Sequence, residues 1–121
     1  MPQNSDKRTT VNILLSTYNG DRYLRELLDS LEQQTWPEIN IHIRDDGSND
    51  NSLEKIQKFC RTCRFPTRFE QGSNIGVKRS FLSLLQNTKG KNALYAFCDQ
   101  DDVWKPNKVL RAVEHIGRQQ S

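Results

Sequence analysis

Three carboxylates crowd into four positions late in the chain, at Asp99, Asp101 and Asp102. Carboxylates placed so close repel one another unless a cation lies between them. Asp99 and Asp101 are two residues apart, so in extended backbone both side chains can point the same way and bind Mg²⁺ or Mn²⁺ through oxygen. Such ions usually keep one or two protein carboxylates and take their other ligands from substrate phosphates and water. The pattern therefore favours a nucleoside diphosphate ligand over a structural ion.

The alternative for this acidic segment is a polar loop, in which one carboxylate caps the next helix and the others are hydrated. That alternative fits less well with the apolar run immediately before Asp99 and with Val103-Trp104 immediately after it, which would hold the loop in place.

A second acidic turn, Asp45-Asp46-Gly47-Ser48, follows the alternating residues of 39–43. An Asp-Gly pair beside Ser is common turn chemistry. The functional alternative is that Asp46 accepts hydrogen bonds from a nucleobase or a ribose while Asp45 supports the turn. Tyr18 leaves a similar choice, between an aromatic ring that stacks on a base and a residue of the pocket rim.

The elements that must position these residues follow from the apolar periodicity, which predicts four strands that alternate with four helices. The strands are expected at 11–16, 39–44, 67–70 and 93–98, and the last of them is so apolar that we expect it to be central. We expect Asp21 to cap the first helix, Asp50 or Asn51 to cap the second, and Pro106 to open the last. The third helix carries the apolar residues of 81–85.

This order predicts an α/β fold with a mostly parallel sheet of about four strands flanked by helices on both faces. In such sheets ligands bind beyond the carboxyl ends of the strands. Segments 16–19, 45–46, 72–76 and 99–102 all follow strands, so one edge of the sheet should collect every unusual residue.

Length and charge narrow the class of protein. The 121 residues suit one domain, 11–121, after a flexible polar N-terminus, 1–10. The net charge of +3 is modest and spread out, so we expect no nucleic acid; the cations between Lys55 and Arg79 form either a solvated helix face or a surface for phosphates or an anionic membrane.

Cysteine usage and hydropathy indicate a cytoplasmic protein. Three cysteines cannot all pair, and Cys60-Arg61-Thr62-Cys63 lacks the second pair of a zinc site. No apolar stretch approaches the ~20 residues that span a bilayer, and the polar start of the chain is unlike a signal peptide. The chain also has no Gly-x-Gly-x-x-Gly, no P-loop and no Ser-His-Asp arrangement.

Four motifs in order closely resemble the N-terminal half of family 2 glycosyltransferases with the GT-A fold, from Thr10 to the C-terminus. They are Leu15-Ser16-Thr17-Tyr18-Asn19-Gly20, Arg44-Asp45-Asp46-Gly47-Ser48-Asn49-Asp50, Gly72-Ser73-Asn74-Ile75-Gly76 and Asp99-Gln100-Asp101-Asp102-Val103-Trp104. The residues of these motifs look most like those of rhamnosyltransferase members of the family. The resemblance implies a three-layer, Rossmann-like half-domain that binds a nucleotide sugar.

The resemblance also implies roles for individual residues. Asp101 would be the metal ligand of the Asp-x-Asp motif, with Asp99 near the ribose and the metal, and Mn²⁺ or Mg²⁺ as the ion. Some relatives carry an arginine four residues after the glycine that matches Gly76, where this chain has Ser80. The nucleotide-binding residues implied are Ser16, Thr17, Tyr18, Asn19, Asp46, Asn74, Lys78 (or Arg79) and Asp99.

The family's chemistry is inverting transfer of a sugar from a UDP- or dTDP-sugar to a glycan or lipid-linked acceptor, here in surface polysaccharide synthesis, with peripheral membrane association of a longer protein. A general base deprotonates the acceptor hydroxyl while the cation neutralises the departing diphosphate. In relatives the base lies in the segment that follows the last helix predicted here. We therefore expect a truncated protein or an excised domain, with the base beyond Ser121.

Three alternatives remain. A nucleotidyltransferase would be expected to carry a glycine-rich, basic loop after the first strand. In this chain the corresponding segment, 17–22, has one glycine, which counts against this alternative. A receiver-like regulatory domain would place acids after its first and third strands, whereas here they follow the second and fourth. The third alternative is a fragment that binds nucleotide and transfers nothing.

Overall fold

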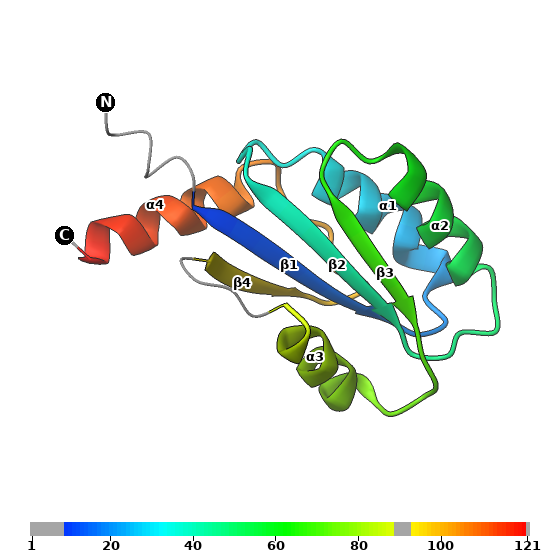
Figure 1. Cartoon of the computed structure of the whole chain (residues 1–121). Coiled ribbons are helices and arrows are strands. Elements are labelled where there is room, and N and C mark those ends of the chain that lie inside the picture. Colours follow the sequence, from blue (N-terminus) through cyan, green and yellow to red (C-terminus); the bar gives the residue numbers. More distant parts are fainter. Residues whose placement is uncertain (1–8, 89–92, 121) are drawn as a thin grey trace.

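The structure, a computed structural model, describes residues 9–88 and 93–120 and contains four strands that alternate with four helices (Figure 1). The predicted flexible segment 1–10 falls mostly outside the described residues, and the first strand already begins at Thr10. The elements are β1 (Thr10–Thr17), α1 (Asp21–Glu32), β2 (Ile39–Asp45), α2 (Ser52–Thr62), β3 (Thr67–Gln71), α3 (Val77–Gln86), β4 (Ala93–Cys98) and α4 (Lys108–Gln120).

The four strands form one parallel sheet in the order β3-β2-β1-β4. β1 is central: Ile13 pairs with Ile41 of β2 on one side and with Ala96 of β4 on the other. The prediction that β4 is central was wrong for the sheet of the described residues, because β4 pairs with β1 alone and lies at the edge. An apolar run shows that a strand avoids water but not how many neighbours it has, and Phe97 of β4 is 56% exposed.

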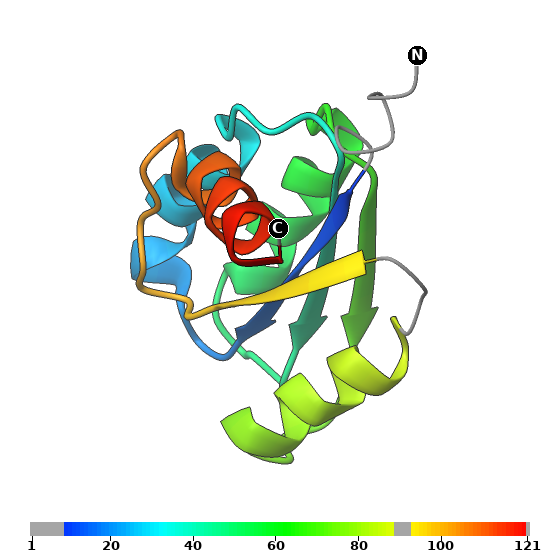
Figure 2. The same cartoon turned by 90° about the vertical axis from the view of Figure 1, so that its left-hand side faces the viewer.

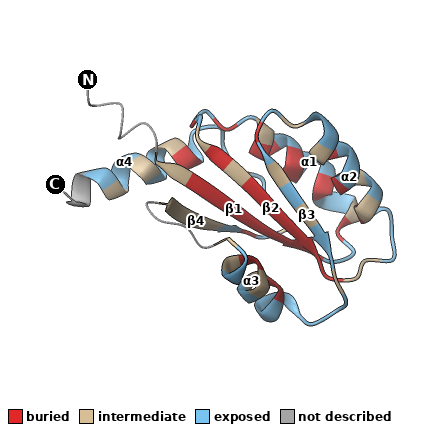
Figure 3. Cartoon of the chain, in the orientation of Figure 1, coloured by how far each residue is buried: buried red, intermediate tan, exposed pale blue. Residues whose placement is uncertain are grey.

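The sheet lies between two helical layers, as predicted. Helices α1 and α2 cover one face and α3 covers the other (Figures 1 and 2). α4 joins the α1 side, since its Val109 belongs to the same apolar cluster as Leu24 and Leu27 of α1. β1 and β2 are buried along most of their length, whereas β4 is largely half-buried (Figure 3).

The two faces of the sheet differ in chemistry. Toward α1 and α2, successive inward positions of β1 and β2 are apolar, and Ile13 and Ile41 are fully buried. Toward α3 the alternate positions include the polar residues Asn12, Ser16, His42 and Arg44, all of them buried. α3 therefore packs on a face that carries hydrogen-bonding groups, and those groups reach the carboxyl end of the sheet.

The helix starts agree with the sequence expectations only in part. Asp21 is the first residue of α1 rather than its cap; Gly20 holds the cap position, and the carboxylate of Asp21 pairs with Lys55 of α2. Asn51 precedes α2 without a capping side-chain bond. The carboxylate of Asp50 takes that role and accepts the N–H of Ser52 at 2.9 Å. α4 begins at Lys108, two residues after Pro106.

Cys60, Cys63 and Cys98 are free thiols, and all three pack in or against the apolar cluster. Among the helices of the described residues, none combines the length and the hydropathy that crossing a bilayer requires.

Candidate functional site

A cavity of about 380 Å³ opens at the carboxyl edge of the sheet, where the loops after β1, β2, β3 and β4 meet. Its volume falls within the range of small-molecule sites. Seven of the residues singled out in the sequence line it: Ser16, Thr17, Tyr18, Asp46, Asn74, Asp99 and Asp101. Residues up to 85 positions apart in the chain thus share one cavity.

Two residues of the predicted set do not line this cavity. Asn19 has a left-handed backbone (φ 47°) and joins the first two loops: its N–H donates to Ser48 Oγ at 2.8 Å, and its Oδ1 accepts the N–H of Asn49 at 2.9 Å. Lys78 instead lines a neighbouring apolar groove of about 270 Å³ with Phe81, Leu82, Leu85 and Phe97. Their contact with a nucleotide stays a prediction.

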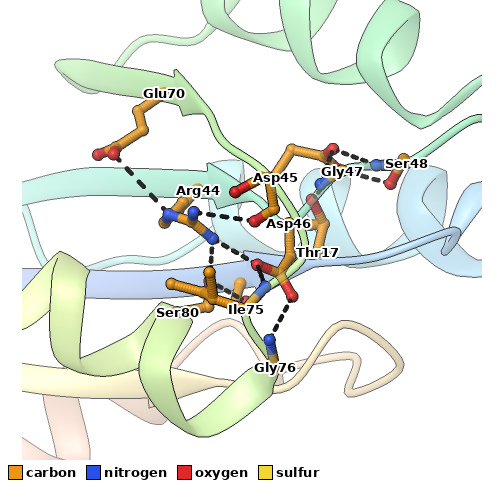
Figure 4. A network of polar contacts seen from close by, with 12 residues as sticks. Thr17, Arg44, Asp45, Asp46, Gly47, Ser48, Glu70, Ile75, Gly76 and Ser80 are labelled. Atoms are coloured by element: carbon orange, nitrogen blue, oxygen red, sulfur yellow. Dashed lines mark hydrogen bonds and ion pairs between the residues drawn. The ribbon is translucent and has the colours of Figure 1, made fainter.

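Asp45 supports the second loop and does not line the cavity. Its Oδ1 accepts the hydroxyls of Thr17 at 2.7 Å and Ser48 at 2.6 Å, while its Oδ2 accepts the N–H groups of Gly47 and Ser48 at 3.1 and 2.7 Å (Figure 4). A carboxylate has about four acceptor positions, and all are filled here. The turn-supporting role expected of Asp45 agrees with these contacts.

Asp46 is held differently, because its partners come from its own strand and from the loop before α3. Oδ1 accepts Arg44 Nη1–H at 2.6 Å and the N–H of Ile75 at 3.0 Å, and Oδ2 accepts the N–H of Gly76 at 3.0 Å (Figure 4). Burial alone would raise the pKa of Asp46, but these hydrogen bonds and the charge of Arg44 hold the pKa below its usual value. One acceptor position, on Oδ2, is left over.

The acidic loop after β4 forms another wall of the cavity. Asp99 and Asp101 both line it, while Asp102 accepts the indole N–H of Trp104 at 3.3 Å. Burial, followed by the charges of Asp102 and Asp99, raises the pKa of the Cys98 thiol to about 12. Among residues 9–88 and 93–120, no three His, Cys, Asp or Glu side chains are grouped so as to hold a metal ion.

Gln100 is a site residue that the sequence analysis missed. Its side-chain amide forms two hydrogen bonds with the backbone of Tyr18: Oε1 accepts the N–H at 2.8 Å and Nε2 donates to the C=O at 3.1 Å. This pairing fixes the first loop against the acidic loop. The only signal in the sequence is an amide residue between two carboxylates. The other lining residues missed are Gly76, Val77 and Phe81.

The sequence matches a known family over nearly its whole length. The model of "Glycosyl transferase family 2" matches residues 12–121. An uncharacterized glycosyltransferase of Nostoc sp. is 36% identical over 104 residues, which are 86% of this chain and 32% of the relative. The dTDP-rhamnosyl transferase RfbG of Shigella flexneri is 30% identical over 105 residues, which are 83% of this chain and 36% of the relative. The chain thus spans about a third of the length of these relatives.

Solved structures agree with the fold. TarS of S. aureus, solved in complex with UDP-GlcNAc, superposes with a TM-score of 0.81 at 26% identity over 93% of this chain and 32% of that one. The mannosyltransferase PcManGT of Pyrobaculum calidifontis, in complex with GDP-Man and Mn²⁺, has a TM-score of 0.75 at 20% identity over 85% of this chain and 30% of that one, which shows a shared fold. The family model, the relatives and the arrangement of the strands agree, and the chain belongs to glycosyl transferase family 2.

Proposed function

We propose that this chain is the donor-binding part of a metal-dependent, inverting glycosyltransferase. It would transfer a sugar from a UDP- or dTDP-sugar to a glycan or lipid-linked acceptor in surface polysaccharide synthesis. The observation that carries the proposal is the cavity, which places Asp46 and Tyr18 together with the carboxylates of Asp99 and Asp101. Binding of UDP-GlcNAc by TarS and the dTDP-rhamnosyl activity named for RfbG support this choice of donor.

The hydrogen bonds of Asp46 support a pyrimidine base. Three of its four acceptor positions are taken within the protein, which leaves room for one further N–H. Uracil and thymine present one ring N–H between two carbonyls, whereas guanine presents two neighbouring donors that would need two acceptor positions. Tyr18, 44% exposed at the mouth of the cavity, offers a ring on which the base can stack.

The acidic loop fits a divalent cation. Among the described residues, no side chain donates a hydrogen bond to the carboxylate of Asp99 or of Asp101; the Cys98 thiol donates only to the backbone C=O of Asp99, so both carboxylates are available. Two carboxylates suffice for Mg²⁺ or Mn²⁺ when a substrate diphosphate supplies further oxygens, so the lack of a three-residue cluster agrees with such a site. When bound, the ion would neutralise negative charge on the departing nucleoside diphosphate.

The remaining chemistry needs a base that removes the proton of the acceptor hydroxyl. We assign no residue of this chain to that step, because the three carboxylates that line the cavity already serve the donor. This chain matches about a third of the length of these relatives, and we propose that a further segment of the kind they carry supplies the base and the acceptor site.

Calorimetric titration of UDP, dTDP and GDP, each with and without Mn²⁺, tests the proposal. We expect UDP or dTDP to bind in a Mn²⁺-dependent way, GDP to bind more weakly, and Asp101→Ala to abolish the effect of Mn²⁺. Asp102→Ala is the matched control, since that carboxylate lies in the same loop but contacts Trp104 instead of lining the cavity. A folded protein that binds none of the three nucleotides would contradict the donor site.

A further inference from the structure

Arg44 is a buried cation that contacts Asp46, a residue of the cavity wall, without lining the cavity itself. It lies near the carboxyl end of β2 on the α3 side of the sheet and is 5% exposed. Its Nη1 donates to Asp46 Oδ1 at 2.6 Å and to Ser80 Oγ at 3.1 Å, and its Nη2 donates to the C=O of Ser73 at 3.2 Å (Figure 4). One guanidinium thus joins β2, the loop after β3 and α3.

The surroundings of this guanidinium are shaped to receive it. A Cβ atom on Gly72 would lie 2.1 Å from Arg44 Nη2, so the loop backbone packs directly against the charged group. On the other side Ser80 is fully buried, and it also accepts the hydroxyl of Ser16 at 2.6 Å. Small residues at both positions leave space that a larger side chain would fill.

The main partner of the positive charge on Arg44 is the carboxylate of Asp46. A buried cation is stable only when it is paired, and the carboxylate of Asp46, itself 3% exposed, is its near partner. Glu70 Oε2 lies 3.7 Å from Arg44 Nε, and the Glu70 side chain is 46% exposed, so this second ion pair is longer and more exposed to solvent. The Nε atom has no hydrogen-bond partner among the described residues.

We propose that Arg44, which donates a hydrogen bond to Ser80, is a positioning residue for Asp46. It orients the Asp46 carboxylate so that the one remaining acceptor position on Oδ2 faces the donor base. Arg44 and the N–H of Ile75 hold Oδ1, and the N–H of Gly76 fills one position of Oδ2. These three donors fix the carboxylate plane. This inference rests on the proposed function, in which Asp46 accepts the ring N–H of uracil or thymine.

A mutation of Arg44 can have two distinct effects on ligand binding. Loosening of the cavity as a whole would weaken every ligand alike. Loss of orientation at Asp46 would remove the preference for a base that carries its ring N–H, because the directional hydrogen bond is what distinguishes such a base. The ratio of affinities for UDP and for 3-methyluridine 5′-diphosphate, in which a methyl group replaces that N–H hydrogen, reports the second effect, because general loosening leaves the ratio unchanged.

The test compares this ratio in the wild type, Arg44→Gln, Ser80→Ala and Glu70→Gln, by calorimetry with Mn²⁺ present. The wild type should prefer UDP by about tenfold or more, as expected for a hydrogen bond to a charged group. Arg44→Gln should bring the ratio close to one, Ser80→Ala should lower it part of the way, and Glu70→Gln should leave it near the wild-type value. Circular dichroism confirms that each variant is folded.

Other outcomes overturn the inference, and they differ from failure of the donor site. A wild type that binds no nucleotide contradicts the proposed function itself. A wild type that binds UDP without preference shows that Asp46 does not read the ring N–H, which removes the role of Arg44 as well. An Arg44→Gln variant that weakens both ligands equally, or neither, shows that Arg44 only stabilises the fold. If Arg44→Gln does not fold, an unchanged ratio in Ser80→Ala has the same meaning.

Discussion

At the scale of one residue, Gln100 holds two loops of the site in fixed positions relative to each other. Its amide forms both hydrogen bonds that the backbone of Tyr18 offers there, so Tyr18 and the acidic loop keep a fixed separation. Each such bond contributes about 1 kcal/mol when it is formed within a protein. A site whose walls are fixed before the ligand arrives avoids part of the ordering cost of binding.

We predict that Gln100→Ala weakens nucleotide binding about five- to thirtyfold, because both bonds to Tyr18 are lost. Calorimetric titration with UDP and Mn²⁺ measures the change. Gln57→Ala is the matched control, since Gln57 is an exposed glutamine of α2 outside the cavity. Equal affinity in the Gln100→Ala variant and the wild type would show that the first loop keeps its place without the amide.

Asp50 gives a prediction about pH. Burial acts to raise its pKa, but the hydroxyl and N–H of Ser52 and the N–H of Asp21 outweigh burial and lower it. A lowered pKa in the folded state stabilises the protein above the ordinary Asp value of about 4, and this contribution is lost as the pH falls through the folded pKa. Asp50→Asn should therefore lower the free energy of unfolding at pH 7 by less than about 1 kcal/mol, because Asp50 is exposed, and the loss should shrink below pH 4.

Urea unfolding of the wild type and Asp50→Asn at several pH values between 2.5 and 7 measures this difference. Asn51→Ala serves as the control, because the side chain of Asn51 makes no capping bond to α2. A difference between wild type and Asp50→Asn that stays constant with pH would contradict a role for the ionised carboxylate.

At the scale of elements, α3 is the one helix of the described residues that covers its face of the sheet (Figure 2), and it contacts that face through polar as well as apolar side chains. Leu84 is 3% exposed and faces the sheet, while Leu82 on the same helix is 51% exposed. We predict that Leu84→Ala lowers the free energy of unfolding by about 2–3 kcal/mol, and that Leu82→Ala changes it by less than about 0.5 kcal/mol. Urea unfolding at pH 7 measures both, and equal losses would mean that α3 packs with another face inward.

The elements themselves were predictable because each carries its own period. The alternation of Ile39, Ile41 and Ile43 reflects burial of one face of β2, and the leucines of α1 repeat at helical spacing, so local patterns identify both. Strand order was not predictable, since β1 could pair with any strand of similar hydropathy. The edge position of β4 and the later start of α4 depend on contacts between distant segments.

The site was predictable to a similar degree. Loops that follow parallel strands must meet at one edge, which brings Asp46 and Asp101 together from motif positions alone. The contacts of Gln100 with Tyr18 lie 82 residues apart in sequence, and those of Arg44 with Ser80 lie 36 apart. No local pattern encodes such pairs, so the residues that position the site became visible only in the folded chain.

For the molecule as a whole, β4 forms one of the two edges of the sheet, and among the described residues it pairs only with β1. Phe97 of β4 is 56% exposed and packs edge to face on Phe81 at 5.3 Å, beside the apolar groove that also includes Lys78. Unpaired backbone at the edge of a sheet readily pairs with another chain. We predict that the 121-residue chain self-associates as its concentration rises and that Phe97→Lys shifts it toward the monomer.

Sedimentation velocity over a range of concentrations measures this association. Tyr23→Lys is the matched control, because Tyr23 is an aromatic residue of α1 with similar exposure, 48%, away from the β4 edge. Association that Tyr23→Lys reduces as much as Phe97→Lys does would point to general surface hydrophobicity instead of the edge.

The pairing of β1 with β4 has a consequence for synthesis on the ribosome. β1 is made first, but the neighbour that completes its second side, where Ile13 meets Ala96, emerges 83 residues later. The layer of β1, β2 and β3 with α1 and α2 can therefore assemble while translation continues, whereas the acidic wall of the cavity is made only after α3 and β4. Nucleotide capture by a nascent chain would thus mark the moment at which β4 has paired with β1.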